Sequence, residues 1–147
     1  MEILTKSAAE TQVLGKKLGA SLKGGDIVAL IGDLGSGKTT FVQGIAQSLD
    51  IKNQIISPTF ILMRTYNTKK LVDSTPVSLL HVDLYRLEGD INQEITNMGL
   101  NDLWGEKTNI VIIEWAEKIK DKLPRTTKYV YFDNLGEDTR KIIIKHE

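Results

Sequence analysis

The sequence predicts an α/β fold in which helices cover a mixed, mainly parallel central sheet that ends in a C-terminal antiparallel hairpin. Two observations support this prediction. In the first half of the chain, short apolar runs typical of buried strands alternate with segments of helical periodicity. Near the C-terminus, two strand-like segments follow one another with a turn signal between them. The sequence has no linker, internal repeat or low-complexity segment, so residues 1–147 are expected to form one domain.

The chain is predicted to begin with a helix that leads into a buried strand. Ser7 and Glu10 have the spacing of a capping box, and leucines recur every four residues after them on one helical face. The segment Lys23-Gly-Gly25 ends this helix. Residues 27–31 are all apolar, which is the pattern of a central strand covered on both faces.

The middle of the chain is predicted to hold a second helix, two strands and a third helix. The second helix runs through residues 40–49 with one apolar stripe. Strands are expected over residues 60–66 and 77–83, with the polar segment 67–75 as a surface loop between them. The third helix spans residues 90–99, from an aspartate cap to a glycine stop.

The last third of the chain is predicted to complete the sheet. Residues 110–113 form a second fully apolar strand, and a short amphipathic helix precedes Pro124. Residues 128–132 and 140–145 are the two strands of the closing hairpin, with the segment 134–136 near its turn.

The composition is that of an ordinary soluble globular protein, with 41% hydrophobic and 26% charged residues. No apolar run approaches the roughly 18 residues of a transmembrane helix, and no signal-peptide segment is present, so we expect a cytoplasmic protein without a membrane partner. The absence of cysteine excludes disulfides and thiolate metal sites. The formal net charge is zero, whereas a protein that holds nucleic acid by itself usually has a basic excess. Any nucleic-acid role is therefore expected to be indirect.

A glycine-rich loop follows the first predicted strand. The segment Gly32-Asp-Leu-Gly-Ser-Gly-Lys-Thr39 matches every fixed position of the phosphate-binding P-loop and lies, as that motif requires, between a buried strand and an amphipathic helix. Its glycines allow successive N–H groups to turn toward one anion, and the helix N-terminus adds further unpaired N–H groups. We therefore predict a single-domain P-loop NTPase sandwich that binds ATP and Mg²⁺.

The loop chemistry assigns roles to individual residues. Lys38 is expected to reach the β- and γ-phosphates, and the hydroxyl of Thr39 is expected to ligate Mg²⁺. The predicted cofactor-binding residues of this segment are Gly32, Asp33, Leu34, Gly35, Ser36, Gly37, Lys38, Thr39 and Thr40.

Two predicted strands end in a carboxylate. Glu114 closes the apolar run 110–113, as a Walker B acid does, and Asp83 closes the strand 77–83. Ligands of an open α/β sheet bind beyond the carboxyl ends of its strands, so these acids are placed to hold Mg²⁺ and to orient the attacking water. For either acid alone, a solvated turn or a helix cap is the commoner role.

Three further residues near these acids have two interpretations each. His81 shares a strand face with Asp83, but a lone histidine there is more often a satisfied, partly buried core residue. Trp115 either lines a nucleotide pocket or packs in the core. In the segment Ser57-Pro-Thr59-Phe60, Thr59 either senses the γ-phosphate and Mg²⁺ or belongs to a proline turn.

Taken together, four motifs resemble those of the TsaE family, also called YjeE. They are the P-loop, Ser57-Pro-Thr-Phe60, His81-Val-Asp-Leu-Tyr-Arg86 and Ile113-Glu-Trp115, and their order and intervals fit that family. The stretch from Glu94 to Trp104 is also similar. The resemblance extends from the first helix to about Pro124, and no motif after that point matches.

The resemblance implies a bacterial ATPase that is weak alone and supports synthesis of threonylcarbamoyladenosine at position 37 of tRNAs that read codons beginning with adenine. It implies TsaD and TsaB as partners, with tRNA reached only indirectly through their complex. By resemblance, Thr39 and Glu114 hold Mg²⁺, Asp83 is a required acid near the γ-phosphate, Thr59 has a switch-like role and Ser7 contacts the nucleotide.

Three other functions are alternatives to this one. A small-molecule P-loop kinase usually needs an arginine-bearing lid, whereas the four arginines here are scattered along a short chain. A GTPase is disfavoured because the sequence has no Asn-Lys-x-Asp motif. In a nucleotide-gated docking module, ATP switches a binding surface and hydrolysis resets it, and the family resemblance partly supports this alternative.

Overall fold

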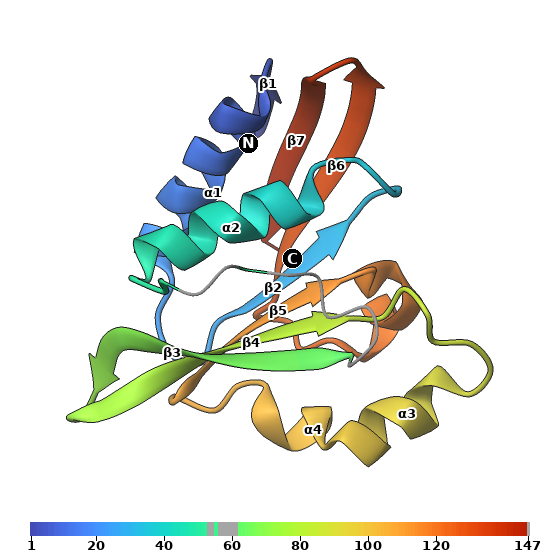
Figure 1. Ribbon diagram of the computed structural model, residues 1–147. Coiled ribbons are helices and arrows are strands. Elements are labelled where there is room, and N and C mark those ends of the chain that lie inside the picture. Colours follow the sequence, from blue (N-terminus) through green and yellow to red (C-terminus); the bar gives the residue numbers. More distant parts are fainter. Residues whose placement is uncertain (53–54, 56–61, 147) are drawn as a thin grey trace.

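The computed structural model describes residues 1–52, 55 and 62–146 and contains one seven-stranded sheet with helices on both faces (Figure 1). None of the helices in these ranges has the length and apolar character needed to cross a membrane. The elements are β1 (Glu2–Thr5), α1 (Ala8–Ser21), β2 (Ile27–Ile31), α2 (Lys38–Ser48), β3 (Met63–Val72), β4 (Thr75–Asp83), α3 (Ile91–Met98), α4 (Leu100–Leu103), β5 (Asn109–Glu114), the 3₁₀ helix η1 (Ala116–Lys122), β6 (Lys128–Gly136) and β7 (Thr139–His146).

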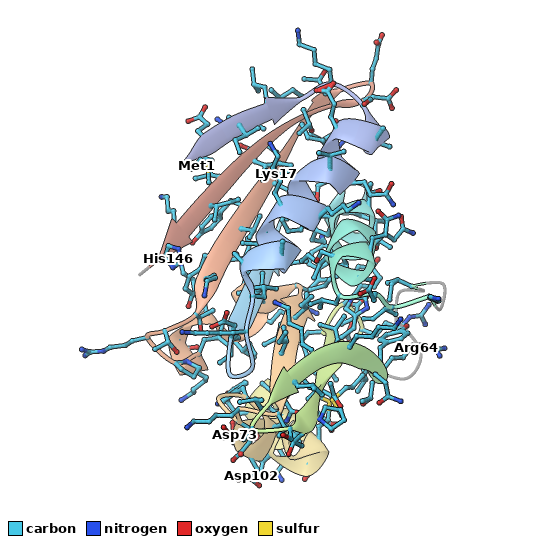
Figure 2. The ribbon with its side chains drawn as sticks, turned by 90° about the vertical axis from the view of Figure 1, so that its left-hand side faces the viewer. Met1, Lys17, Arg64, Asp73, Asp102 and His146 are labelled. Carbon is cyan, nitrogen blue, oxygen red and sulfur yellow. The ribbon has the colours of Figure 1, made fainter. Side chains whose placement is uncertain are left out.

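The strand order is β1-β7-β6-β2-β5-β4-β3. The four central strands β6, β2, β5 and β4 are parallel to one another. β3 pairs antiparallel with β4 at one edge, and β7 and β1 continue the sheet antiparallel from β6 at the other. Figure 2 shows β1 and β7 side by side, with Met1 beginning the first and His146 ending the second. The mixed sheet with a parallel centre and a C-terminal hairpin confirms the predicted fold class.

The central strands are buried on both faces because alternate side chains enter two different cores. In β2, Val28 and Leu30 pack with α1 and α2, whereas Ile27 and Ala29 pack with residues of α3, α4 and η1. Figure 1 shows these two groups of helices on opposite sides of the sheet. The run at 27–31 is continuously apolar because both faces of β2 are covered, so side chains on either face of the strand are removed from water.

Glycines let α1 and α2 approach each other closely. A Cβ added to Gly15 of α1 would lie 2.1 Å from the carbonyl oxygen of Phe41 in α2, and one added to Gly44 would lie 2.0 Å from that of Gln12. Both distances are much shorter than a van der Waals contact, so a side chain at either position would clash with the other helix. The close crossing places the first turn of α1 against the start of α2, where Thr11 lies near Gly37.

The capping predictions for two helices are confirmed. The Ser7 hydroxyl accepts a hydrogen bond from the Glu10 N–H at 3.1 Å and begins α1. The carboxylate of Asp90 accepts one from the Gln93 N–H at 3.1 Å and begins α3, and Gly99 ends that helix with φ of 71°.

The predicted surface loop over residues 67–75 is wrong. β3 continues through this segment to Val72, and a tight turn at Asp73 and Ser74 leads directly into β4 (Figure 2, where Arg64 and Asp73 mark the two ends of β3). The polar side chains lie on an edge strand with one wet face, while Thr68 is buried and donates to the Val77 carbonyl at 2.7 Å. An edge strand exposes polar residues at alternate positions, so its composition resembles that of a loop.

Candidate active site

The carboxyl ends of β2, β4 and β5 meet at one edge of the sheet and border a cavity of about 440 Å³. The P-loop between β2 and α2 forms one wall, and it lies beside the β6–β7 hairpin in Figure 1. The cavity is lined by Leu34, Gly35, Ser36, Gly37, Lys38, Thr39, Thr40, Asp83, Tyr85, Glu114, Trp115 and Arg140.

The loop has the backbone that an anion nest requires. Gly35 and Gly37 have φ of 75° and 103°, in the left-handed region that other residues rarely adopt. At Gly32 an added Cβ would lie 2.8 Å from the Phe132 carbonyl oxygen, so β6 leaves no room for a side chain. The hydroxyl of Ser36 is buried and has no hydrogen-bond partner among the residues that the structure describes. These features fit a loop whose polar groups are arranged around a bound anion.

Lys38 is buried and turned back onto its own loop. Its ammonium donates hydrogen bonds to the carbonyl oxygens of Gly32 and Asp33, the latter at 3.2 Å. It also lies 4.0 Å from the centre of the Trp115 ring. Burial lowers the pKa of Lys38, and nearby carboxylates, Glu114 first among them, oppose this by favouring the charged form.

Asp83 and Glu114 are brought together by the register of the sheet. They are paired at the ends of the parallel strands β4 and β5, and each is only 3% exposed. Asp83 Oδ1 accepts a hydrogen bond from the Tyr85 N–H at 2.9 Å. Glu114 Oε2 lies 2.6 Å from His81 Nε2. Each acid is thus held by a different neighbour, although both face the same cavity.

Trp115 combines the two interpretations that the sequence left open. It lines the cavity and also packs partly against the core on the α3 side of the sheet. Its ring centre lies 5.0 Å from that of Tyr85, and its φ of 60° is unusual for a bulky residue. Backbone strain of this kind persists where the surrounding structure fixes it, and it is common at functional sites.

Arg140 is a cavity residue that sequence reasoning missed. Its guanidinium donates to the Gly35 carbonyl at 3.2 Å and to three acceptors of the β6–β7 hairpin, the Asn134 side chain and the carbonyls of Glu137 and Thr139, at 2.8–3.0 Å. No local pattern marks this arginine. The pairing of β6 with β2 brings it to a loop that lies 105 residues away in the sequence.

Other predicted site residues lie at the margin of the cavity or outside the described ranges. Ser7 caps α1 and is followed by Ala8, which lines a second small cavity of about 40 Å³ with Gly37, Thr40 and Arg140. Gly32 and Asp33 contact the Lys38 ammonium through their carbonyls. Thr59 and its neighbours at 57–60 lie outside the described residues.

The donor set fits Mg²⁺ together with a phosphate. The hydroxyl of Thr39 and the carboxylate of Glu114 line the same cavity, and both are hard oxygen donors of the kind that Mg²⁺ prefers. Mg²⁺ is usually held by one or two carboxylates and completes its coordination with substrate phosphates and water. A nest, a buried ammonium and two carboxylates around one cavity are the parts that a phosphoryl-transfer site requires.

Comparisons with known proteins identify the family of this chain. A family model described as "Threonylcarbamoyl adenosine biosynthesis protein TsaE" matches residues 5–142. The chain is 35% identical over 138 residues to the tRNA threonylcarbamoyladenosine biosynthesis protein TsaE of Bacillus subtilis (strain 168), which covers 94% of this chain and 80% of that protein. It is 32% identical over 145 residues to the protein of the same name from Treponema pallidum (strain Nichols), covering 98% and 99% of the two chains.

A solved structure extends the agreement to the fold. The crystal structure of Bacillus subtilis YdiB superposes with a TM-score of 0.75 at 28% sequence identity, and the match covers 100% of this chain and 86% of that one. The family match includes the P-loop, both strand-end acids and the part of the hairpin that carries Arg140. The chain belongs to the TsaE family.

Proposed function

We propose that this chain is a Mg²⁺-dependent ATPase that takes part in forming threonylcarbamoyladenosine at position 37 of tRNAs that read codons beginning with adenine. The observation that carries the proposal is the meeting of a glycine loop, the buried Lys38 and the register pair Asp83–Glu114 around one cavity. The name of the relatives, tRNA threonylcarbamoyladenosine biosynthesis protein, supports the pathway.

In this proposal the P-loop and the first turn of α2 hold the phosphates of ATP. The N–H groups of that turn have no partner within the helix, so they are available to an anion. On binding, the Lys38 ammonium exchanges the carbonyls of Gly32 and Asp33 for phosphate oxygens, because a charged acceptor makes the stronger hydrogen bond. Its charge then offsets the negative charge that grows toward the leaving oxygen.

The acids and the hydroxyls divide the remaining tasks. Glu114 and Thr39 hold Mg²⁺, which when bound neutralises charge on the β- and γ-phosphate oxygens. Asp83, fixed by the Tyr85 N–H, orients the attacking water. The switch-like role of Thr59 rests on the family resemblance. The nucleotide contact proposed for Ser7 is supported by the position of α1 against Gly37 and Thr40.

TsaD and TsaB are the proposed partners, and tRNA is reached indirectly through their complex. The formal net charge of zero supports an indirect role, since neutralising a phosphate backbone needs an excess of basic residues. A small-molecule kinase is less well supported than the ATPase. Among the arginines of the described residues, Arg140 alone lines the cavity, whereas such kinases clamp the transferred group with several.

A nucleotide-gated docking module is the second candidate, and one contact favours it. The ammonium of Lys118 in η1 donates to the carbonyls of Leu84, Tyr85 and Leu87 at 2.8–2.9 Å. These carbonyls follow Asp83, and η1 follows Glu114 and Trp115. In this candidate, a change at either acid would reach a segment in which Tyr85 is exposed, as a switched docking surface requires.

A reconstituted assay with TsaB, TsaD, the threonylcarbamoyl-adenylate synthase, tRNA and ATP tests the proposal. We expect this chain to support repeated turnover of modified tRNA and to release phosphate faster when TsaB and TsaD are present. Lys38→Ala should abolish both effects, while Lys16→Ala, on the exposed side of α1, should leave them unchanged.

Two outcomes separate the candidates. If no mixture releases phosphate and tRNA modification does not depend on this chain, the ATPase proposal is wrong. If modification requires ATP binding but survives in a variant that no longer hydrolyses ATP, the docking module is the better description.

A further inference from the structure

His81 holds one oxygen of the Glu114 carboxylate. Its side chain is fully buried in β4, and its Nε2 lies 2.6 Å from Oε2 of Glu114 at the end of the neighbouring strand β5. A buried hydrogen bond to a charged acceptor is short and strong, so it fixes the rotation of the carboxylate. Glu114 also lines the cavity, and because Oε2 already accepts the bond from His81, Oε1 is the oxygen with more acceptor capacity left for a ligand.

The surroundings of the imidazole assign its proton. Nδ1 of His81 is buried and has no hydrogen-bond partner among the residues that the structure describes. A proton on Nδ1 would be a buried donor without an acceptor, which is costly. Glu114 in contrast needs a donor on Nε2. Nε2 is therefore assigned as the nitrogen that donates to Glu114.

We infer that His81 is a positioning residue that presents Glu114 to a divalent cation through Oε1 alone and thereby favours Mg²⁺ over Ca²⁺. This inference rests on the proposed function, because it takes Glu114 as the metal ligand. It gives a role to a residue that the proposed function leaves without one, and it gives the metal preference a structural cause.

The cause is the difference in coordination between the two ions. Mg²⁺ takes six ligands in near-ideal octahedral geometry at about 2.0–2.1 Å, and one oxygen from each carboxylate suits it. Ca²⁺ takes more ligands at longer distances and readily accepts both oxygens of one carboxylate. A carboxylate whose second oxygen is held by His81 offers Ca²⁺ only a single contact.

Two variants separate positioning from packing. His81→Gln keeps an N–H donor near the position of Nε2, whereas His81→Met fills a similar volume without any donor. Thr68→Val is the matched control, because it removes another buried hydrogen bond, the 2.7 Å bond to the Val77 carbonyl, at the opposite end of β4. Thermal unfolding of all three variants measures the loss of stability that each change causes.

The first measurement is ADP affinity by calorimetry with Mg²⁺ and with Ca²⁺. In His81→Met we expect the Mg²⁺-supported affinity to fall about tenfold, as is typical when the partner of a metal ligand is lost, and the Mg²⁺/Ca²⁺ ratio to shrink. His81→Gln should recover most of the ratio, and Thr68→Val should keep it. An unchanged ratio in His81→Met, or equal losses in the Gln and Met variants, would overturn the inference.

The second measurement needs no nucleotide. The chain has two histidines, so ¹⁵N spectra of the ring nitrogens are assigned by comparison with His81→Gln. We expect a protonated Nε2, and an Nε2 without a proton would overturn the inference. If the wild-type protein binds ADP with neither ion, the proposed function fails and the metal preference fails with it. The ring spectrum still decides whether His81 donates to Glu114.

Discussion

Asp83 and Glu114 form the last register pair between β4 and β5, so two carboxylates stand side by side at the rim of the cavity. Their surroundings differ. Glu114 is held by the imidazole of His81, and Asp83 by the backbone N–H of Tyr85. Carboxylates that ligate a metal are usually hydrogen-bonded to a further group, as Glu114 is to His81, and the difference in partners supports different roles for the two acids.

Loss of each acid is expected to change a different kinetic quantity. Glu114→Gln should lower Mg²⁺-dependent ATP affinity about tenfold and reduce turnover as well, because a metal anchor stabilises both the bound nucleotide and the transition state. Asp83→Asn should lower kcat about 100-fold with little change in affinity, because a group that orients water acts chiefly in the transition state. Calorimetry at several Mg²⁺ concentrations and turnover with TsaB and TsaD provide the measurements. The opposite pattern would show that the two roles are reversed.

The buried ammonium of Lys38 should make the stability of the empty protein depend on alkaline pH. Burial lowers its pKa below the ordinary 10.5, so between the folded-state pKa and 10.5 the unfolded chain binds more protons than the folded protein. The free energy of unfolding therefore rises with pH through that window. Lys38→Met lacks this ionisation, so its stability relative to wild type should be greatest at neutral pH and should decrease as the pH approaches 10.5.

Urea denaturation of both proteins between neutral pH and the upper end of this window tests the expectation. Lys16→Met on the exposed side of α1 is the control, and its difference from wild type should not vary with pH. A difference between Lys38→Met and wild type that is constant across the range would contradict the effect of burial.

The crossing of α1 and α2 predicts an unusual result for a glycine in a helix. Alanine is the better helix former by about 1 kcal/mol, so Gly15→Ala would stabilise a free helix. Here the new Cβ meets the Phe41 carbonyl at 2.1 Å, and the overpacking should outweigh the gain and lower the free energy of unfolding by about 1–3 kcal/mol. Ala20→Gly, on the exposed side of the same helix, isolates the propensity effect. Chemical denaturation that finds Gly15→Ala more stable than wild type would refute the close packing.

Features that depend on neighbouring residues in the sequence were predicted, and features that depend on the sheet were not. The P-loop, the caps at Ser7 and Asp90 and the buried run at 27–31 each follow from a local pattern. β1 was missed, because four residues at a sheet edge have too little periodicity to be recognised. The hydrogen bond between His81 and Glu114 was missed for a related reason, since it arises from the parallel pairing of β4 with β5.

Arg140 should contribute to nucleotide binding through both its charge and its geometry. Its guanidinium joins the Gly35 carbonyl to the β6–β7 hairpin and places a positive charge at the wall of the cavity. Arg140→Gln removes the charge and most of the contacts, so ATP affinity should fall about tenfold. Arg140→Lys keeps the charge but lacks the planar fork that reaches several acceptors at once, so it should recover part of the loss. Lys141→Gln, at the next position of β7, is the control for the loss of one surface charge, because Lys141 pairs with Asp133 away from the cavity.

Calorimetry of ATP binding at low and high salt separates the contribution of the Arg140 charge from that of its contact with the P-loop. The charge effect should weaken as salt screens it, whereas the effect of losing the contact to the P-loop should persist. Wild-type affinity in Arg140→Gln at low salt would show that the contact with Gly35 has no role in binding.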